Sequence, residues 1–400
     1  MNLYLEAKDI FARLVDLRHE LHRNPEVGLH LPATQSRVVK SLEGLPLQIV
    51  LGKSLSSVTA VLHGSHPGPT VLLRGDMDGL PLHETSGEPF TSEIDGNMHA
   101  CGHDIHTAGL VGAAELLSQH RDDLHGSVIF MFQPGEEGHD GAAQMLAEGC
   151  ADLTGELPVA AYAVHMEAAA PVGSVLTRTG TVFLAGTGIT VAIKGRGGHG
   201  GRPHLTLDPI PAMTAILSGL QQVAAHASDP FQSFVLSVGK VQAGTAPNII
   251  ADSAEISMSL RSVSDATHQT VIERIRRLCT NTAIAFGVEA EIRIDVNFPA
   301  TVNAANEVER AERVVAGMFG TEAWTPMETP FTGSDDFGHV LAKIPGVYMM
   351  LGARPSEIKS DDTVQMHSPN VRFDDEVLPV AAGLLAALTL DRLADPQQIS

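Results

Sequence analysis

The sequence predicts an α/β fold, with a mixed, mostly parallel sheet, helices on both of its faces, and an inserted α+β domain. Three observations support this prediction. Short apolar runs alternate with helical patterns through the first half of the chain, as in proteins built on parallel strands. The middle of the chain then changes to the order strand, helix, strand, strand, helix, strand. After Pro299 the helical pattern resumes.

The first half supplies most of the predicted central sheet. Leucines recur at helical spacing from residue 14 to residue 21, until Asn24 and Pro25 end that helix. Short, nearly continuous apolar runs follow, which are typical of strands buried on both faces. The predicted strands are residues 58–62, 71–73, 128–132 and 159–164. Helical patterns lie between them at residues 107–117 and 142–147.

The middle of the chain predicts a ferredoxin-like insertion. Its strand, helix, strand, strand, helix and strand are expected at residues 189–193, 212–225, 234–241, 254–260, 266–286 and 288–294. A helix at 308–318, a strand at 347–351 and a last helix at 376–393 follow. We therefore expect a split domain of residues 1–184 and 295–400, interrupted by a second domain of residues 185–294.

Composition and charge exclude several classes of protein. The chain is 44% hydrophobic and carries 26 basic and 47 acidic residues, for a net charge of −21. Nucleic acids and anionic membranes require clustered Lys and Arg, so we expect neither as a partner.

The apolar stretch 380–390 is shorter than the roughly 20 residues of a membrane helix. Cys101, Cys150 and Cys279 are too few for a disulfide framework. These features predict a soluble, cytoplasmic protein, with Cys150 and Cys279 as inert core residues.

Donors that suit a metal ion accompany the predicted strands. Cys101 and His103 stand two residues apart, and in extended backbone such side chains point to the same side. Thiolate and imidazole suit Zn²⁺, with Mn²⁺ or Co²⁺ as alternatives where carboxylates join them. His165 follows the 159–164 strand, and His367 lies in a polar loop. Each has an ordinary explanation by itself, as a structural cysteine or a core or surface histidine. The set as a whole predicts a site for one or two metal ions.

Two adjacent carboxylates, Glu136 and Glu137, follow the 128–132 strand. Open α/β sheets bind ligands at the carboxyl ends of their strands, and Gly135 and Gly138 permit bends that aim both side chains inward. One carboxylate can ligate a metal while its neighbour accepts a proton from metal-bound water. A solvated acidic turn remains the alternative.

Together these segments resemble the amidohydrolase branch of the M20 metallopeptidase family, which contains hippurate hydrolases, N-acyl-amino-acid hydrolases and auxin-conjugate hydrolases. The resemblance covers nearly the whole chain in family order. Its motifs are LHxxPE at 21–26, RGDMDGLP at 74–81, CGHD at 101–104, QPxEE at 133–137, His165, GH at 198–199, PH at 203–204, GSDDF at 333–337 and MHSP at 366–369. Asp335 stands where the family usually has Glu, and Gly200 and Gly201 where small alanines are common; both departures bear on substrate fit.

The resemblance implies a catalytic domain with an inserted lid, in agreement with the pattern above. It also implies a centre of two divalent metal ions with five ligands: Cys101, His103, Glu137, His165 and His367. Glu136 would be the general base, and Asp78 a carboxylate that orients a ligand. In the lid, His199 would bind the oxyanion of the transition state, and Asn248 and Arg261 would hold the polar end of the substrate.

The expected function is hydrolysis of N-acyl-L-amino acids to a carboxylic acid and a free amino acid, by metal-bound water with Glu136 as the base. We expect two divalent ions per subunit, Zn²⁺ first and Mn²⁺ or Co²⁺ as alternatives, and a homodimer or higher homo-oligomer. A dipeptidase or carboxypeptidase of the same family is the alternative enzyme. A non-catalytic, metal-stabilised binding protein is the alternative class, and an intact Glu136 argues against it because a binder needs no base.

Overall fold

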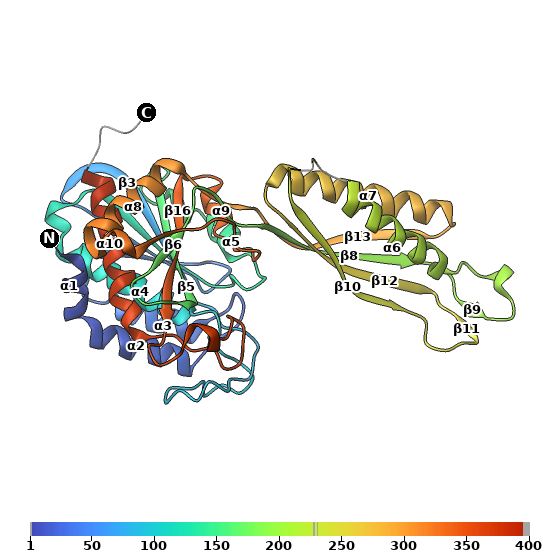
Figure 1. Cartoon of the computed structure of the whole chain (residues 1–400), viewed down its shortest axis with the longest axis horizontal. Coiled ribbons are helices and arrows are strands. Elements are labelled where there is room, and N and C mark those ends of the chain that lie inside the picture. The colour runs from blue at the N-terminus through green and yellow to red at the C-terminus, as the bar shows by residue number, and fades with distance from the viewer. Residues whose placement is uncertain (1, 227–228, 230, 395–400) are drawn as a thin grey trace. The chain divides into compact units, whose positions relative to one another are not determined.

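The computed structural model describes residues 2–226, 229 and 231–394, which form two compact units (Figure 1). Unit 1 comprises Met1–Val182, Val302–Thr329 and Asp336–Ser400. Unit 2 comprises Phe183–Thr301 and Pro330–Asp335. The short segment Pro330–Asp335, which the sequence pattern places with the split domain, belongs to unit 2 because it pairs with the start of that unit. Leu184 N donates to Gly333 O at 2.9 Å, and the rings of Phe183 and Phe331 stack.

An eight-stranded mixed sheet forms the centre of unit 1. In spatial order its strands are β1 (Leu47–Leu51), β2 (Val58–His63), β4 (His125–Gln133), β3 (His66–Asp76), β5 (Ala160–Pro171), β16 (Gly346–Arg354), β6 (Val175–Thr177) and β15 (Trp324–Pro326). The central strands β4, β3, β5 and β16 are parallel, whereas β1, β2 and β4 pair antiparallel. The predicted mostly parallel α/β sheet is confirmed.

Helices cover this sheet and complete the core of unit 1. They are α1 (Leu3–Asp9), α2 (Phe11–Arg23), α3 (Pro32–Ser41), α4 (His103–Gln119), α5 (Gly141–Ala147), α8 (Ala305–Phe319), α9 (Gly338–Leu341) and α10 (Leu378–Ala394). Helices α4 and α10 pack on each other and on β3 and β5. Their packing needs small residues: a Cβ on Gly112 would lie 2.8 Å from the Cβ of Ala382. Residues 375–394 are long and apolar enough to cross a membrane, but 78% of that apolar window is buried inside the protein, which makes α10 a core helix.

Unit 2 contains an antiparallel four-stranded sheet and two helices. Along the chain it has β8 (Ala185–Lys194), α6 (Pro209–His226), β10 (Phe234–Ala243), β12 (Ser253–Ser262), α7 (Asp265–Ala285) and β13 (Glu289–Phe298). Its sheet order is β10-β12-β8-β13. Every second residue of β12 is buried, because one face of the sheet packs against α6 and α7 in a separate hydrophobic core. The short strands β9 (Gly198–His199) and β11 (Ile249–Ile250) pair with each other, and β7 (Gly180–Phe183) and β14 (Thr301–Asn303) lie near the unit boundary.

Candidate metal centre

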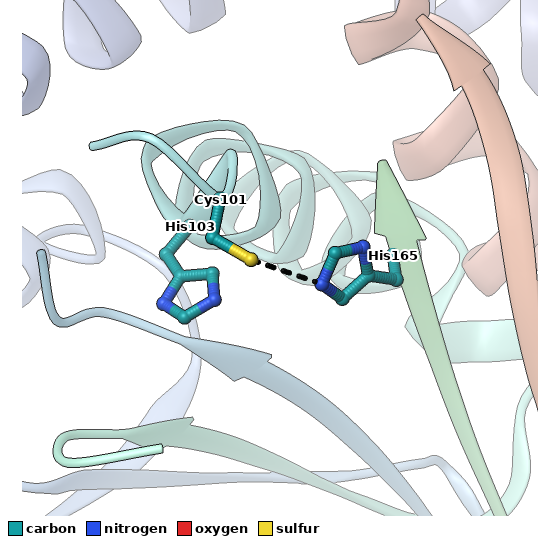
Figure 2. Close-up of side chains that lie close together, drawn as sticks. All are labelled: Cys101, His103 and His165. Atoms are coloured by element: carbon teal, nitrogen blue, oxygen red, sulfur yellow. Dashed lines mark hydrogen bonds between the residues drawn. The ribbon is translucent and has the colours of Figure 1, made fainter. Parts of the chain in front are cut away.

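Cys101, His103 and His165 bring their side chains together in the interior of unit 1 (Figure 2). Figure 2 shows Cys101 and His165 pointing toward each other, with the His103 ring beside them. Cys101 Sγ lies 3.4 Å from His165 Nε2, and one donor atom from each residue falls within 4.8 Å of the others. All three residues are buried. A thiol and two imidazoles at this spacing can bind one metal ion.

The convergence of Cys101 and His103 has a different cause from the predicted one. The expectation of extended backbone at this point is wrong, because the chain turns at Gly102 and helix α4 begins at His103. Gly102 has φ = 84°, which is costly for a residue with a Cβ. A Cβ there would also lie 3.1 Å from the Cβ of Met166. A glycine at this position therefore allows the two donors to face one point.

The expected place of His165 at a strand end is also wrong. Strand β5 continues beyond it to Pro171, because β16 runs alongside as far as that residue. The other neighbour, β3, pairs with β5 only as far as Arg74 and Ala163. His165 thus lies within β5, just beyond the last β3–β5 pair.

Hydrogen bonds set the tautomers of the two buried histidines. His103 Nδ1 lies 2.9 Å from Asp78 O, and His165 Nδ1 lies 2.8 Å from Met166 O. A carbonyl oxygen only accepts, so each neutral ring carries its proton on Nδ1 and keeps the Nε2 lone pair for a metal. His103 Nε2 is buried and has no hydrogen-bond partner among the described residues. A buried imidazole nitrogen without a hydrogen-bond partner fits a position for a metal ion.

Glu137 and His367 extend the cluster on the other side of Cys101. Donor atoms of these three residues also lie within 4.8 Å of one another, and His367 Nε2 is 3.0 Å from Glu137 Oε1. His367 has φ = 65°, an uncommon conformation for a residue with a side chain. Its N–H donates to Ala100 O at 3.0 Å, which ties this strained residue to the segment that carries Cys101. The five donors therefore form two groups of three that share Cys101.

One carboxylate positions the adjacent glutamates. Asp78 Oδ1 accepts the N–H of Glu136 at 3.1 Å, and its Oδ2 accepts the N–H of Glu137 at 3.0 Å. The flanking Gly135 and Gly138 have φ of 71° and 79°, as the bends require. Glu136 is 7% exposed, and its Oε2 lies 3.9 Å from His103 Nε2. Both side chains thus face the cluster from one anchored turn.

The electrostatic field at the cluster favours a cation. Burial lowers the pKa of His103, but the carboxylates of Asp76, Asp78 and Glu137 outweigh it and raise that pKa to about 10. The cluster therefore holds a proton on a buried imidazole when no other positive charge is present. A divalent cation would satisfy the same field more strongly.

Two supporting residues escaped the sequence analysis. His106 Nδ1 bonds to Asp76 Oδ1 at 2.5 Å, and its Nε2 accepts the N–H of Met166 at 3.0 Å. The His106 ring packs against that of His165, with 4.8 Å between centroids. Asp76 in turn is paired with the buried Arg74. Asp76 ends β3 two residues before Asp78, but its hydrogen bond to His106 joins residues 30 positions apart, which no local pattern encodes.

The candidate residues of unit 2 are more open. His199 and Asn248 are exposed and lie near each other, because His199 pairs with Ile249 across β9 and β11. Gly200 N donates to Asn248 O at 2.9 Å. Arg261 is half-buried near the end of β12 and donates to Ser334 Oγ.

Cys150 and Cys279, which we expected to be inert core residues, lie outside the cluster. Both are buried free thiols, and burial raises the pKa of each to about 12. A thiol with so high a pKa is a poor nucleophile and a poor metal ligand at neutral pH.

A group of metal donors gathered at one place on an α/β sheet is what a metal-dependent hydrolase requires. Residues 72–391 match Peptidase family M20/M25/M40, and the chain belongs to this family. It is similar to the N-acetylcysteine deacetylase of Bacillus subtilis, with 34% identity over 96% of this chain and 97% of that protein. It is also similar to the hippurate hydrolase of Campylobacter jejuni, with 31% identity over 98% of this chain and 100% of that one.

Among solved structures, the chain resembles a dinuclear metal-binding peptidase of the M20 family from Bacillus subtilis. The two share 31% identity and a TM-score of 0.80, over 97% of this chain and 99% of that one. The protein is accordingly an enzyme of the metal-dependent amidohydrolase class, with divalent metal ions as its cofactor.

Proposed function

We propose that this enzyme hydrolyses the amide bond of N-acyl-L-amino acids and releases a carboxylic acid and a free amino acid. Two similar enzymes support the substrate class, since N-acetylcysteine and hippurate are both N-acyl amino acids. The observation that carries the proposal is the anchored glutamate pair: one carboxylate faces His367 and its neighbour faces His103. This arrangement supplies a ligand and a separate base in one turn.

The proposed metal ligands are Cys101, His103, Glu137, His165 and His367, which would hold two divalent ions. Zn²⁺ suits this donor set best, and Mn²⁺ and Co²⁺ are alternatives because a carboxylate is included. When bound, the ions would polarise the amide carbonyl and lower the pKa of the attacking water. The backbone oxygens of Asp78 and Met166 keep the two buried rings in the tautomer that binds metal.

Glu136 is the proposed general base. Its backbone is fixed by Asp78 and its side chain is largely excluded from solvent, so the carboxylate stays close to the place where water would be activated. It takes a proton from the attacking water and returns it to the leaving nitrogen. In unit 2, we propose that His199 stabilises the oxyanion and that Asn248 and Arg261 hold the polar end of the substrate.

We also propose a cytoplasmic setting and a homodimer or higher homo-oligomer. The small number of cysteines, three in 400 residues, supports the first, because it gives no disulfide framework of the kind that secreted proteins use. Exposed apolar side chains on unit 2, such as Phe231, Val235 and Val241, support the second, since they would lose solvent contact in an assembly.

The test is a substrate comparison with the metal-loaded enzyme. Benzoyl-glycine and N-acetyl-cysteine should be hydrolysed, a chelator should abolish turnover, and added Zn²⁺, Mn²⁺ or Co²⁺ should restore it. Hydrolysis of unblocked dipeptides with no release of benzoate would instead identify a dipeptidase. Failure to turn over either class with a full metal content would favour the binding protein.

A further inference from the structure

The side chain of Arg261 lies across the sheet of unit 2 rather than pointing into solvent. Arg261 on β12 pairs directly with Gly186 on β8, and paired residues of antiparallel strands project on the same face. A Cβ built on Gly186 would fall 2.0 Å from Arg261 Nη1. The guanidinium therefore rests over Gly186, in space that any other residue would fill.

Ser334 stands where the Arg261 side chain ends. The same Cβ on Gly186 would lie 2.5 Å from Ser334 Oγ, and Arg261 Nη1 donates to that oxygen. Ser334 is fixed there because Leu184 N donates to Gly333 O and the Phe183 and Phe331 rings stack. All of these contacts lie within unit 2.

Hydrogen bonds on the opposite, buried face of the sheet link the strands that carry Gly186 and Arg261. The buried His268 joins the residues next to Gly186 and Arg261, with Nε2 2.5 Å from Thr187 Oγ1 and Nδ1 2.8 Å from Ser262 Oγ. Thr187 Oγ1 also donates to Asn297 Oδ1 on β13 at 2.8 Å. Three strands and helix α7 are thus linked at this level, so the guanidinium has a rigid base.

The pair has unused hydrogen-bond donors. Within the described residues, Arg261 forms no ion pair with a carboxylate, and its single protein acceptor is Ser334 Oγ. Burial lowers the pKa of Arg261 without an acidic group to oppose it. Ser334 accepts a bond from Arg261, so its own hydroxyl proton is available and meets no acceptor among the described residues. A half-buried cation beside a free hydroxyl is suited to a carboxylate, which offers two acceptor oxygens.

We propose that Ser334 is a specificity-determining residue that donates its hydroxyl to the α-carboxylate of the substrate, alongside Arg261, and that Gly186 is required to keep the guanidinium in reach. This inference rests on the proposed function, since it names the group of the N-acyl amino acid that this site selects. The two donors bind the two oxygens of one carboxylate. An uncharged amide in its place gains less from the guanidinium and offers one acceptor oxygen instead of two.

The first arm of the test measures binding without turnover. In a Glu136→Gln background, calorimetry gives the dissociation constants of benzoyl-glycine and benzoyl-glycinamide for the metal-loaded protein. Ser334→Ala should weaken binding of the acid about tenfold, as expected for a hydrogen bond to a charged group, and leave the amide within about twofold. Gly186→Ala should do the same or more, by displacing Arg261. Ser259→Ala, an exposed serine on the same face of β12, should change neither.

The second arm measures kcat and KM for both substrates with Glu136 intact. Ser334→Ala should raise KM for benzoyl-glycine with little change in kcat, and the acid-over-amide preference should fall about tenfold. Equal losses on acid and amide, or no loss in either arm, would overturn the inference. If the parent enzyme binds benzoyl-glycine through Ser334 but hydrolyses no N-acyl amino acid, the proposed function fails and the inference stands.

Discussion

The two units present their polar residues in opposite ways. In unit 1, Cys101, His103 and His165 are buried, and the proton positions of both imidazoles are set by backbone carbonyls. In unit 2, His199 and Asn248 are exposed, and they are oriented mainly by the short antiparallel pair of β9 and β11. Burial forces a polar group to find a partner, so the geometry of unit 1 itself points to a cation. Exposed groups carry no such information, and their roles rest on resemblance and on experiment.

Arg261 is intermediate between these cases. It is half-buried and has one firm contact, with Ser334. The comparison therefore predicts a gradient of effects: large where a buried donor is removed, moderate where a supporting group is changed, and small where an exposed side chain is lost.

The largest effect is expected for the metal ligands. Cys101→Ser and His103→Ala should each lose bound metal and at least about 10³-fold in turnover, because removal of a buried donor leaves the cation short of ligands. Elemental analysis and the benzoyl-glycine assay measure the two losses on one preparation. Cys150→Ala, which removes a buried thiol outside the cluster, serves as the control and should retain metal. Full metal content with full activity in both ligand variants would refute the assignment.

A second effect concerns how the free energy of unfolding depends on pH, through the buried ion pairs of His22 with Asp104 and Glu84. Burial lowers the pKa of His22, but the carboxylates of Asp104 and Glu84 outweigh it and raise that pKa to about 9. The folded pKa exceeds the unfolded value, so protonated His22 stabilises the fold fully below about pH 6.5. This contribution, up to about 3 kcal/mol, is lost as the pH rises from 6.5 through 9.

Urea unfolding of the metal-free protein at pH 6 and pH 9 tests this account. The parent should lose more stability between these values than His22→Gln, whose side chain does not titrate. His83→Gln is the control, since that side chain is 73% exposed. Identical pH dependence in the parent and in His22→Gln would show that the network does not hold a proton.

A smaller effect should follow from loosening the glutamate turn. Asp78→Asn keeps one acceptor oxygen but cannot accept from both Glu136 N–H and Glu137 N–H, so metal affinity should fall about 10- to 100-fold. Competition with a chromogenic chelator measures the change. Asp95→Asn, whose parent side chain is 91% exposed, should bind metal like the parent. An unchanged affinity in Asp78→Asn would mean that the turn is held by other contacts.

The smallest effect is expected in unit 2. His199→Ala should lower kcat about tenfold and leave the metal content unchanged, because it removes a contact made mainly in the transition state. His204→Ala removes another exposed histidine nearby and should have little effect. If kcat in His199→Ala equals that of the parent, His199 belongs to an ordinary surface turn.

The sequence was most informative where the signal is local. Continuous apolar runs predicted β2 to within one residue and β4 to within three residues at each end, because these strands are buried on both faces. The end of β5 was missed, since its extension to Pro171 depends on pairing with β16, far away in the chain. Helices α1 and α3 were not predicted; they pack on other elements of unit 1 without a long periodic pattern of their own.

The candidate site likewise has features that the local sequence predicts and features that depend on distant contacts. Residue types and spacing indicated which donors belong together, but not how they meet. The left-handed turn at Gly102 lies against Met166, and the N–H of His367, a residue with positive φ, donates to Ala100 O. Both contacts join residues far apart in the chain, which no local pattern encodes. Asp76 and His106 were missed for the same reason: their importance lies in a hydrogen bond between residues 30 positions apart.

The central claim is that Glu136 and Glu137, neighbours in one turn, have different tasks. Its most direct test is to measure metal content and kcat together for Glu136→Gln and Glu137→Gln, two nearly isosteric changes. We predict that Glu136→Gln keeps its metal and loses roughly 10²-fold or more in kcat, as expected for a lost general base, whereas Glu137→Gln binds metal more weakly. Glu136→Gln with a kcat within a few-fold of the parent, or with its metal lost, would contradict the account.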